Sequence, residues 1–203
     1  MDHATPAPAQ PTTGPPLARE RIVDVAYGLF ARRGIRGVGV DEIIARSGVA
    51  KATFYRHFRS KDELAIAFLE RRDRLWTTDA VVAEARRRGG GGESALLAIF
   101  DVFDEWFHRE DFEACSFINV LVEMGPGHPL GRASIEYLAR IRTHLAVLAR
   151  EAGLRDPEGF ARSWHILMKG SIVSATEGDP TAARLARQMA VWLIESHRAP
   201  PAP

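Results

Sequence analysis

The sequence predicts an all-α protein of about nine helices, and three observations support this fold class. Apolar residues recur at intervals of three and four along the middle of the chain. Alternation of apolar and polar residues between hairpin turn signals, which is typical of strands, is absent. Glycines at helix ends and prolines at helix starts divide the chain into segments of helical length.

The two ends differ in composition from the middle. Residues 1–16 contain five prolines and, after Met1, no large apolar side chain, and residues 199–203 read Ala-Pro-Pro-Ala-Pro. Segments of this kind cannot offset the entropy of ordering by burying apolar surface. We therefore expect a disordered arm over residues 1–16 and a disordered tail over residues 199–203.

The first helix is expected over residues 17–33, with Gly34 as its C-terminal stop. Two short helices follow at 40–47 and 50–58, with a Gly48-Val49 turn between them. This spacing is typical of a helix-turn-helix. Gly48 suits the sharp reversal because a positive φ costs glycine little, and Val49 is expected to point inward.

Six further helices are expected after this unit. Ser60 and Glu63 form a predicted capping box at the start of a long helix that ends near Arg88, before four consecutive glycines. The later helical segments are expected at about 93–107, 112–124, 129–152, 157–177 and 180–197.

Composition and charge narrow the class of protein. Apolar residues make up 46% of the chain and charged residues 26%, which is ordinary for a soluble globular protein. Up to Lys61 the chain has ten basic and five acidic residues, whereas the remainder has 17 basic and 21 acidic ones. A basic first part beside an acidic second part is expected when one end approaches a polyanion.

Neither a membrane span nor a disulfide framework is expected. No apolar run approaches the roughly 20 residues of a transmembrane helix, and the start lacks the features of a signal peptide, so we expect a cytoplasmic protein without a membrane partner. Cys115 is the only cysteine and lies among apolar neighbours, so it is expected to be a buried thiol.

The stretch GIRGVGVDEIIARSGVAKATFYRHFRSKDELAIAF, residues 34–68, resembles the TetR family of bacterial regulators in order and spacing. The resemblance covers residues 18–69 well, and beyond them only the all-helical layout agrees. It implies a three-helix DNA-binding domain over 17–61 and a helical effector-binding and dimerisation domain over 62–198. It also implies a homodimer, a palindromic double-stranded operator and a small-molecule effector.

The second short helix has an apolar face with Phe54 and Phe58, and its opposite face can enter a major groove. By the resemblance, the front of this helix reads base edges through Lys51, Ala52 and Thr53. By the same resemblance, the phosphates are held by Tyr55, Arg56, His57 and Lys61. The chain departs from the family pattern at Val38-Gly39, where a pair of hydroxyl residues is common, although Gly39 remains an acceptable N-cap.

Two further sets of residues are expected from the family resemblance. An aromatic-rich ligand pocket is expected among Trp76, Phe103, Trp106, Phe107, Phe117, Met124, Tyr137, Trp164 and Met168. A dimer interface made by the last two helices is expected among Leu167, Gly170, Ser171, Ser174, Leu185, Ala186, Met189 and Leu193.

The predicted function is a ligand-responsive transcriptional regulator, a repressor that a small apolar or aromatic effector releases from its operator. Two alternatives stay open: a helical protein-interaction module and a metal-dependent enzyme, neither of which binds DNA. Glu105 and His108 have the Glu-x-x-His spacing of helical di-metal sites, but such sites need further glutamates from other helices. We expect no catalytic residues, no metal and no cofactor.

Overall fold

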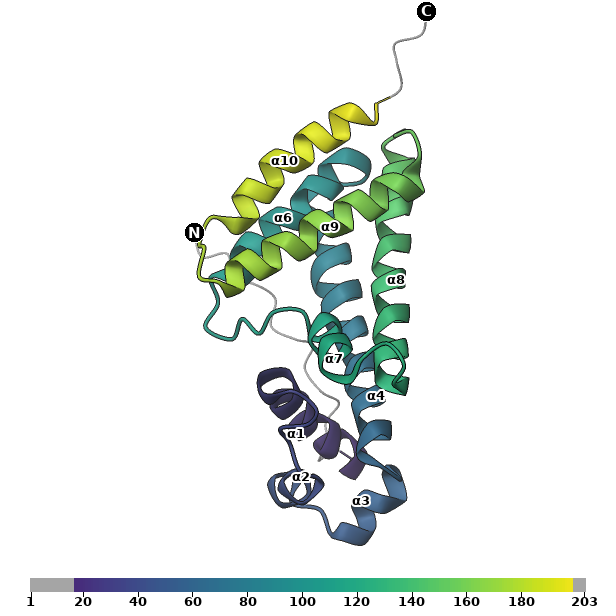
Figure 1. Ribbon diagram of the computed structural model, residues 1–203, viewed down its shortest axis with the longest axis vertical. Helices are drawn as coiled ribbons and strands as arrows, with labels where there is room; N and C mark the ends of the chain where they lie inside the picture. The colour runs from purple at the N-terminus through teal and green to yellow at the C-terminus, as the bar shows by residue number, and fades with distance from the viewer. Residues whose placement is uncertain (1–16, 199–203) are drawn as a thin grey trace, which may run out of the picture.

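A computed structural model of the chain describes residues 17–198, and these residues are helical apart from turns and short connections. The expected arm and tail lie outside the described residues. Three helices at the bottom of Figure 1 form a small unit, which we call the head: α1 (Ala18–Arg33), α2 (Val40–Ser47) and α3 (Lys51–His57).

One continuous helix leads from the head into the rest of the molecule. It begins as α4 (Lys61–Arg72), widens into the π-helical segment η1 (Asp73–Ala83), and ends as α5 (Glu84–Gly89). The sequence predicted the length of this helix but not its π-helical middle. Such segments are rare in proteins and are often found at functional sites.

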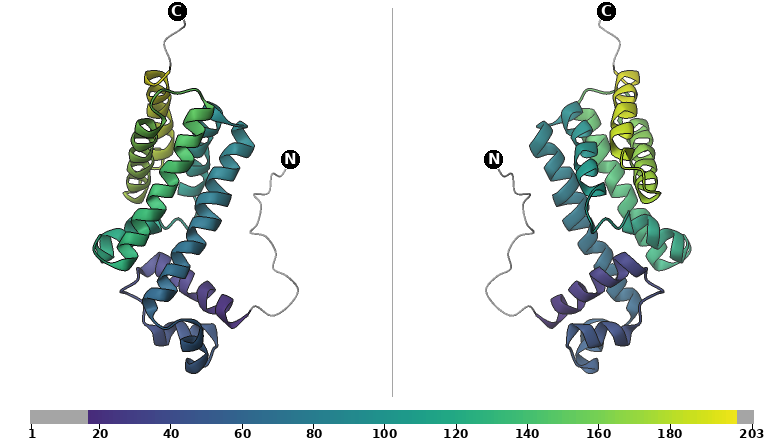
Figure 2. Two further views of the ribbon diagram at one scale, coloured as in Figure 1. Left: turned by 90° about the vertical axis from the view of Figure 1, so that its right-hand side faces the viewer. Right: turned by 90° about the vertical axis from the view of Figure 1, so that its left-hand side faces the viewer.

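Five helices form the upper part, which we call the body: α6 (Gly92–Phe107), α7 (Ser116–Met124), α8 (Pro129–Glu151), α9 (Pro157–Thr176) and α10 (Ala182–Ser196). Helices α9 and α10 lie side by side on one side of the body, and the helix that comes from the head lies on the other (Figure 2). With α4, η1 and α5 counted as one helix, residues 17–198 contain nine helices, as expected.

Two helix starts differ from the sequence prediction. Helix α7 begins at Ser116 rather than near Phe112, because residues 108–115 form turns and an irregular connection. Helix α10 begins at Ala182 rather than at Pro180. There the Asp179 carboxylate accepts hydrogen bonds from the backbone N–H and the hydroxyl of Thr181, both at 2.7 Å, which makes a turn before the helix.

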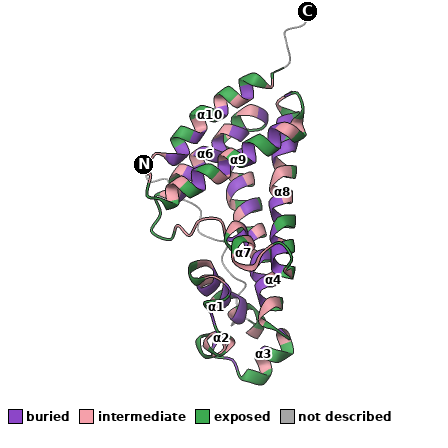
Figure 3. Cartoon of the chain, viewed as in Figure 1, coloured by how far each residue is buried: buried purple, intermediate pink, exposed green. Residues whose placement is uncertain are grey.

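Two hydrophobic cores hold the fold together. The body core lies between α6, α8, α9 and α10, whereas the head core includes the fully buried Phe54 and Phe68. The head core continues into the body through Phe117 and Val120 of α7 and through Leu138 of α8. Figure 3 shows the buried residues on helix faces that are turned toward their neighbours. The head is therefore seated on α7 and α8 by shared apolar packing.

None of the helices within residues 17–198 is long and apolar enough to cross a membrane.

Candidate DNA interface and ligand pocket

The turn between α2 and α3 has the backbone geometry that the sequence predicted. Gly48 adopts the left-handed conformation with φ 63° and ψ 29°, which favours glycine. Val49 is buried in the head core with Ile43 and Phe54. The turn therefore fixes α3 against α2 and determines which face of α3 points outward.

The outward face of α3 is polar and exposed. Lys51, Ala52, Tyr55 and Arg56 are exposed there, while Phe54 is buried on the opposite side. Tyr55 is 45% exposed and its ring meets Phe54 edge-on at 5.3 Å between centroids, so the phenol packs against a buried ring and stays accessible to solvent. This face offers hydrogen-bond donors on a short helix at the end of the molecule.

The polar groups on α3 make only weak contacts within the chain. Lys51 Nζ lies 3.5 Å from Asp41 Oδ1, and both side chains are largely exposed, so solvent screens this pair. Arg56 donates to the Thr53 hydroxyl at 3.1 Å, and Thr53 itself is half-buried. These side chains can exchange their present partners for DNA with little loss.

Lys61 differs from the other predicted phosphate ligands. Its ammonium donates to the backbone carbonyl of Ile35 at 3.0 Å and to that of Val38 at 3.2 Å. It therefore ties the start of α4 to the loop between α1 and α2, which contains the departure at Val38-Gly39. Sequence reasoning missed this second role because the partners lie 26 and 23 residues away.

The junction between α3 and α4 contains the expected capping interaction in altered form. The Ser60 hydroxyl accepts a hydrogen bond from the Glu63 backbone N–H at 3.1 Å, as predicted. The Glu63 carboxylate accepts from the backbone N–H of Arg59 at 2.7 Å instead of that of Ser60. The Glu63 side chain therefore restrains the residue just before the cap.

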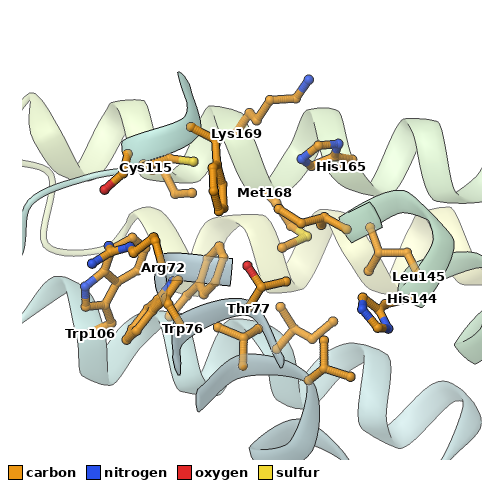
Figure 4. Close-up of a pocket in the computed structure, with 18 of the residues that line it drawn as sticks. Arg72, Trp76, Thr77, Trp106, Cys115, His144, Leu145, His165, Met168 and Lys169 are labelled. Carbon is orange, nitrogen blue, oxygen red and sulfur yellow. The ribbon is translucent and has the colours of Figure 1, made fainter. Parts of the chain in front are cut away.

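A cavity lies in the body between η1, α6, α7, α8 and α9 (Figure 4). The space between its wall atoms amounts to about 650 Å³, including the part that opens to solvent. Five of the residues predicted for a pocket are in its wall: Trp76, Phe103, Trp106, Phe117 and Met168. Most of the wall is aliphatic or aromatic, as in many small-molecule sites.

Four residues predicted for the pocket lie outside its wall: Phe107, Met124, Tyr137 and Trp164. Trp164 is fully buried among aromatic rings of α6 and α9. Tyr137 stacks on the back of Phe117, with 5.1 Å between ring centroids. Phe107 belongs to an aromatic cluster beside the cavity, and Met124 packs against the head core. Aromatic composition alone did not distinguish wall residues from core residues.

None of the polar residues of the wall was predicted from the sequence to line a pocket: Arg72, Thr77, Cys115, Ser116, His144, His165 and Lys169. Arg72 is the most engaged of them. Its guanidinium donates to the Tyr27 hydroxyl of α1 at 2.9 Å and to the Ala114 carbonyl at 3.3 Å, and it lies over the Trp76 ring at 5.3 Å. Arg72 therefore connects the cavity to the head.

Burial dominates the chemistry of two other wall residues. It lowers the pKa of His165 to about 3, with a smaller effect of the positive charges of Lys169 and Arg142, so the imidazole is neutral near pH 7. Burial likewise raises the pKa of the Cys115 thiol, although the residue as a whole is half-buried and not fully buried as expected. His165 Nδ1 and the Ser116 hydroxyl are buried without a hydrogen-bond partner in the described part of the chain.

The Glu-x-x-His motif does not form a metal site among residues 17–198. No group of three or more His, Cys, Asp or Glu side chains there is placed to hold a metal ion. Glu105 instead forms an ion pair with Arg88 at 2.7 Å, and His108 Nδ1 lies 2.7 Å from the Asp104 carbonyl.

The outer side of α9 and α10 exposes several large apolar side chains. Of the residues predicted for a dimer interface, Gly170, Leu185 and Met189 are exposed, and Leu167, Ser174 and Leu193 are half-buried. Ser171 and Ala186, which were also predicted for the dimer interface, are buried within the chain and are not exposed on this side. The prediction missed three exposed apolar residues on the same two helices: Ile166, Val173 and Trp192.

Comparison with known proteins supports both the head and the whole fold. A family profile described as bacterial regulatory proteins, tetR family, matches residues 22–68. The transcriptional regulator AcuR of Cereibacter sphaeroides is 28% identical over 83% of this chain and 84% of that protein. The repressor KstR2 of Rhodococcus jostii is 39% identical over 70 residues, which are 32% of this chain and 34% of that protein.

Solved structures extend the similarity over nearly the whole chain. A TetR-family regulator from Streptomyces coelicolor superposes with a TM-score of 0.76 at 26% identity, over 90% of this chain and 96% of that one. Reduced NemR from Escherichia coli shares the fold, with a TM-score of 0.75 at 22% identity, over 92% of this chain and 99% of that one.

Proposed function

Because the chain belongs to the TetR family of bacterial regulatory proteins, we propose that this transcriptional regulator is a homodimeric repressor whose operator affinity falls when a small, largely apolar molecule fills the cavity. The observation that carries the proposal is the continuous helix Lys61–Gly89. Its first turn follows the recognition helix, and its π-helical segment forms part of the cavity wall through Trp76, Thr77 and Val81.

In this proposal α3 is the recognition helix. Lys51, Ala52 and Thr53 at its front read base edges, and Tyr55, Arg56 and His57 hold phosphates. Lys61 contributes chiefly by fixing the loop before α2, since two of its donors are bonded to carbonyl groups there. Residues 17–61 act as the DNA-binding part and residues 62–198 as the effector-binding and dimerisation part.

The dimer forms through α9 and α10 of two copies. The exposed apolar side chains Ile166, Val173, Met189 and Trp192 lie on these two helices, and a patch of this kind favours association. A two-fold axis there places two recognition helices to face the two halves of a palindromic operator.

Ligand binding changes DNA affinity by selecting between two conformations. A molecule in the cavity contacts η1. Because η1 and α4 are parts of one continuous helix, a shift of η1 moves the head of this copy relative to the head of the partner copy. Thermodynamic linkage requires DNA to weaken ligand binding by the same factor as ligand weakens DNA binding.

The experiment is a fluorescence-anisotropy titration of the protein against the DNA upstream of its own gene, at several salt concentrations. We expect binding that prefers one palindrome over scrambled DNA by a factor of about 10³ or more and that weakens steeply with salt. Equal affinity for scrambled DNA would overturn the assignment of α3 as a recognition helix.

A further inference from the structure

The cavity contains a buried positive charge that no carboxylate of the described residues neutralises. Arg72 is 6% exposed, and within residues 17–198 no Asp or Glu oxygen lies within 4.0 Å of its guanidinium. Its hydrogen bonds go to the neutral oxygens of Tyr27 and Ala114. A buried charge without an ionic partner is unfavourable, so this site is suited to an anion.

The acidic residues nearest to Arg72 are engaged elsewhere. Arg109 has the largest effect in lowering the pKa of Asp111, and burial raises the pKa of Glu113, while the positive charge of Arg72 has a smaller lowering effect on both. Asp111 nevertheless accepts two hydrogen bonds from Arg109, both at 2.7 Å, and Glu113 lies 4.0 Å from Arg32. Arg72 is therefore left without an ion pair among the described residues.

The rest of the wall adds a second cation but no acid. Its described residues include Arg72 and Lys169 and neither Asp nor Glu. In Figure 4 the Lys169 side chain extends away from the cavity, whereas Arg72 lies beside Trp76 and Trp106 at one end. Arg72 is therefore the cation of the wall that is placed to contact an anion inside the cavity.

The cavity wall also contains a neutral hydrogen-bond donor close in sequence to Ala114, a hydrogen-bond partner of Arg72. The Ser116 hydroxyl is buried without a hydrogen-bond partner, two residues after Ala114, whose carbonyl accepts from Arg72. One guanidinium and one hydroxyl match the two oxygens of a carboxylate. A phosphate, with more charge and more acceptor oxygens, would need more donors than this end provides.

From these observations we propose that the effector is a small apolar carboxylate, whose charged end binds Arg72 and Ser116 and whose apolar part lies along Trp76, Phe103 and Met168. This inference rests on the proposed ligand-responsive function and specifies its ligand class. A carboxylate on Arg72 competes with the hydrogen bonds to Tyr27 and Ala114, so binding also alters a direct link between the cavity and α1.

The test applies matched probes to the unaltered protein. Octanoate, 3-phenylpropionate and indole-3-acetate are each compared with their own carboxamide by thermal shift and by quenching of tryptophan fluorescence. We expect at least one acid to raise the Tm with dose and to bind about tenfold or more tightly than its amide, as a charge-assisted hydrogen bond implies. The proposal is overturned if the amides bind as tightly as the acids, or if no acid binds.

Substitutions at Arg72 and Lys169 test which cation of the cavity wall binds the carboxylate. Arg72→Met is expected to remove the preference for acid over amide, and Arg72→Lys to retain part of it. Lys169→Met removes the other cation of the wall and serves as the matched control, in which the preference is expected to persist. Loss of the preference in Lys169→Met alone would contradict the assignment to Arg72. If Arg72→Met does not fold, the comparison of acids with amides in the unaltered protein still decides.

The same samples separate this inference from the function on which it rests. Sequence-specific DNA binding without binding of any acid overturns the ligand class and leaves DNA-binding regulation standing. Binding of an acid that leaves operator affinity unchanged confirms the ligand class and overturns ligand-controlled release.

Discussion

The carboxylate of Glu123 in α7 accepts a hydrogen bond from the backbone N–H of Ile35 at 2.9 Å. It also accepts from the backbone N–H of Arg36 at 2.6 Å. These two bonds join the body to the loop between α1 and α2. The carboxylate satisfies two backbone N–H groups that have no other acceptor among the described residues. The orientation of the head therefore depends on a residue 88 positions further along the chain.

Replacing Glu123 tests this contact. Glu123→Ala is expected to lower the free energy of unfolding by about 1–3 kcal/mol, because two backbone donors lose a charged acceptor. Operator affinity is expected to fall as the head loses its position. Urea unfolding and anisotropy measure the two effects. Glu136→Ala, which removes an exposed carboxylate from α8, is the control, and an equal effect there would refute the role of Glu123.

Tyr27→Phe tests the link between the cavity and the head. The change removes only the hydroxyl that accepts from Arg72, while the ring keeps its edge-on contact with Phe68. We expect operator affinity and ligand affinity, each measured alone, to change less than threefold. The factor by which ligand weakens DNA binding is expected to decrease. An unchanged factor would mean that the signal does not pass through this hydrogen bond.

Trp192→Glu tests the dimer face. Trp192 is 68% exposed on α10, so a charge there does not disturb the core of one copy but opposes apolar association. We expect a monomer in sedimentation at micromolar concentration and a loss of operator affinity. Val122→Glu on α7, where the side chain is 79% exposed, is the matched control and should remain dimeric. A dimeric Trp192→Glu variant would place the interface elsewhere.

Two variants of α3 separate base reading from phosphate binding. Tyr55→Ala is expected to weaken binding to every DNA sequence by a similar factor, because phosphates are the same at each position. Lys51→Ala is expected to relax the preference at one base position, at a cost of about 1–3 kcal/mol in discrimination. Binding to a library of single-base operator variants measures both. The same profile from both variants would refute the division.

His165 predicts a pH dependence of stability. Its pKa is about 3 in the folded protein and about 6.5 when exposed in the unfolded chain. Between these values the unfolded state binds the proton more tightly, so the free energy of unfolding falls as the pH decreases below about 6.5. Well above pH 6.5 the imidazole is unprotonated in both the folded and the unfolded state, so His165 no longer makes the free energy of unfolding depend on pH.

The check is urea unfolding of the unaltered protein and of His165→Gln at pH 7 and pH 5. The variant is expected to lose less stability than the unaltered protein between these two values. His108→Gln on the exposed end of α6 is the control. If both variants followed the pH dependence of the unaltered protein, the buried imidazole would not be its source.

The sequence predicted the features that depend on local interactions. The turn at Gly48, the cap at Ser60 and the buried face with Phe54 follow from residues within a few positions of one another. The features that it missed depend on distant partners. Arg72 meets Tyr27 and Ala114 across 45 and 42 residues, and no local pattern marks such a contact.

The helical periodicity was also too coarse to predict which individual side chains are exposed. It identified α9 and α10 as helices with small and apolar residues, yet the set predicted for the dimer interface included Ser171 and Ala186, which are buried within the chain. It missed Trp192, which is exposed one turn from Met189. The π-helical segment Asp73–Ala83 has no recognised sequence signal, because its composition suits an ordinary helix equally well.

The core that the head shares with α7 and α8 limits how this protein can be divided and recombined. A chimera that joins residues 17–61 to the sensor part of another regulator would leave the head without Phe68, Phe117, Val120 and Leu138 as its covering layer. A graft that keeps this DNA specificity must therefore import α7 and the start of α8 as well, or rebuild an equivalent apolar seat. The unit of exchange is a discontinuous set of helices, and a cut in the chain at a single point does not isolate it.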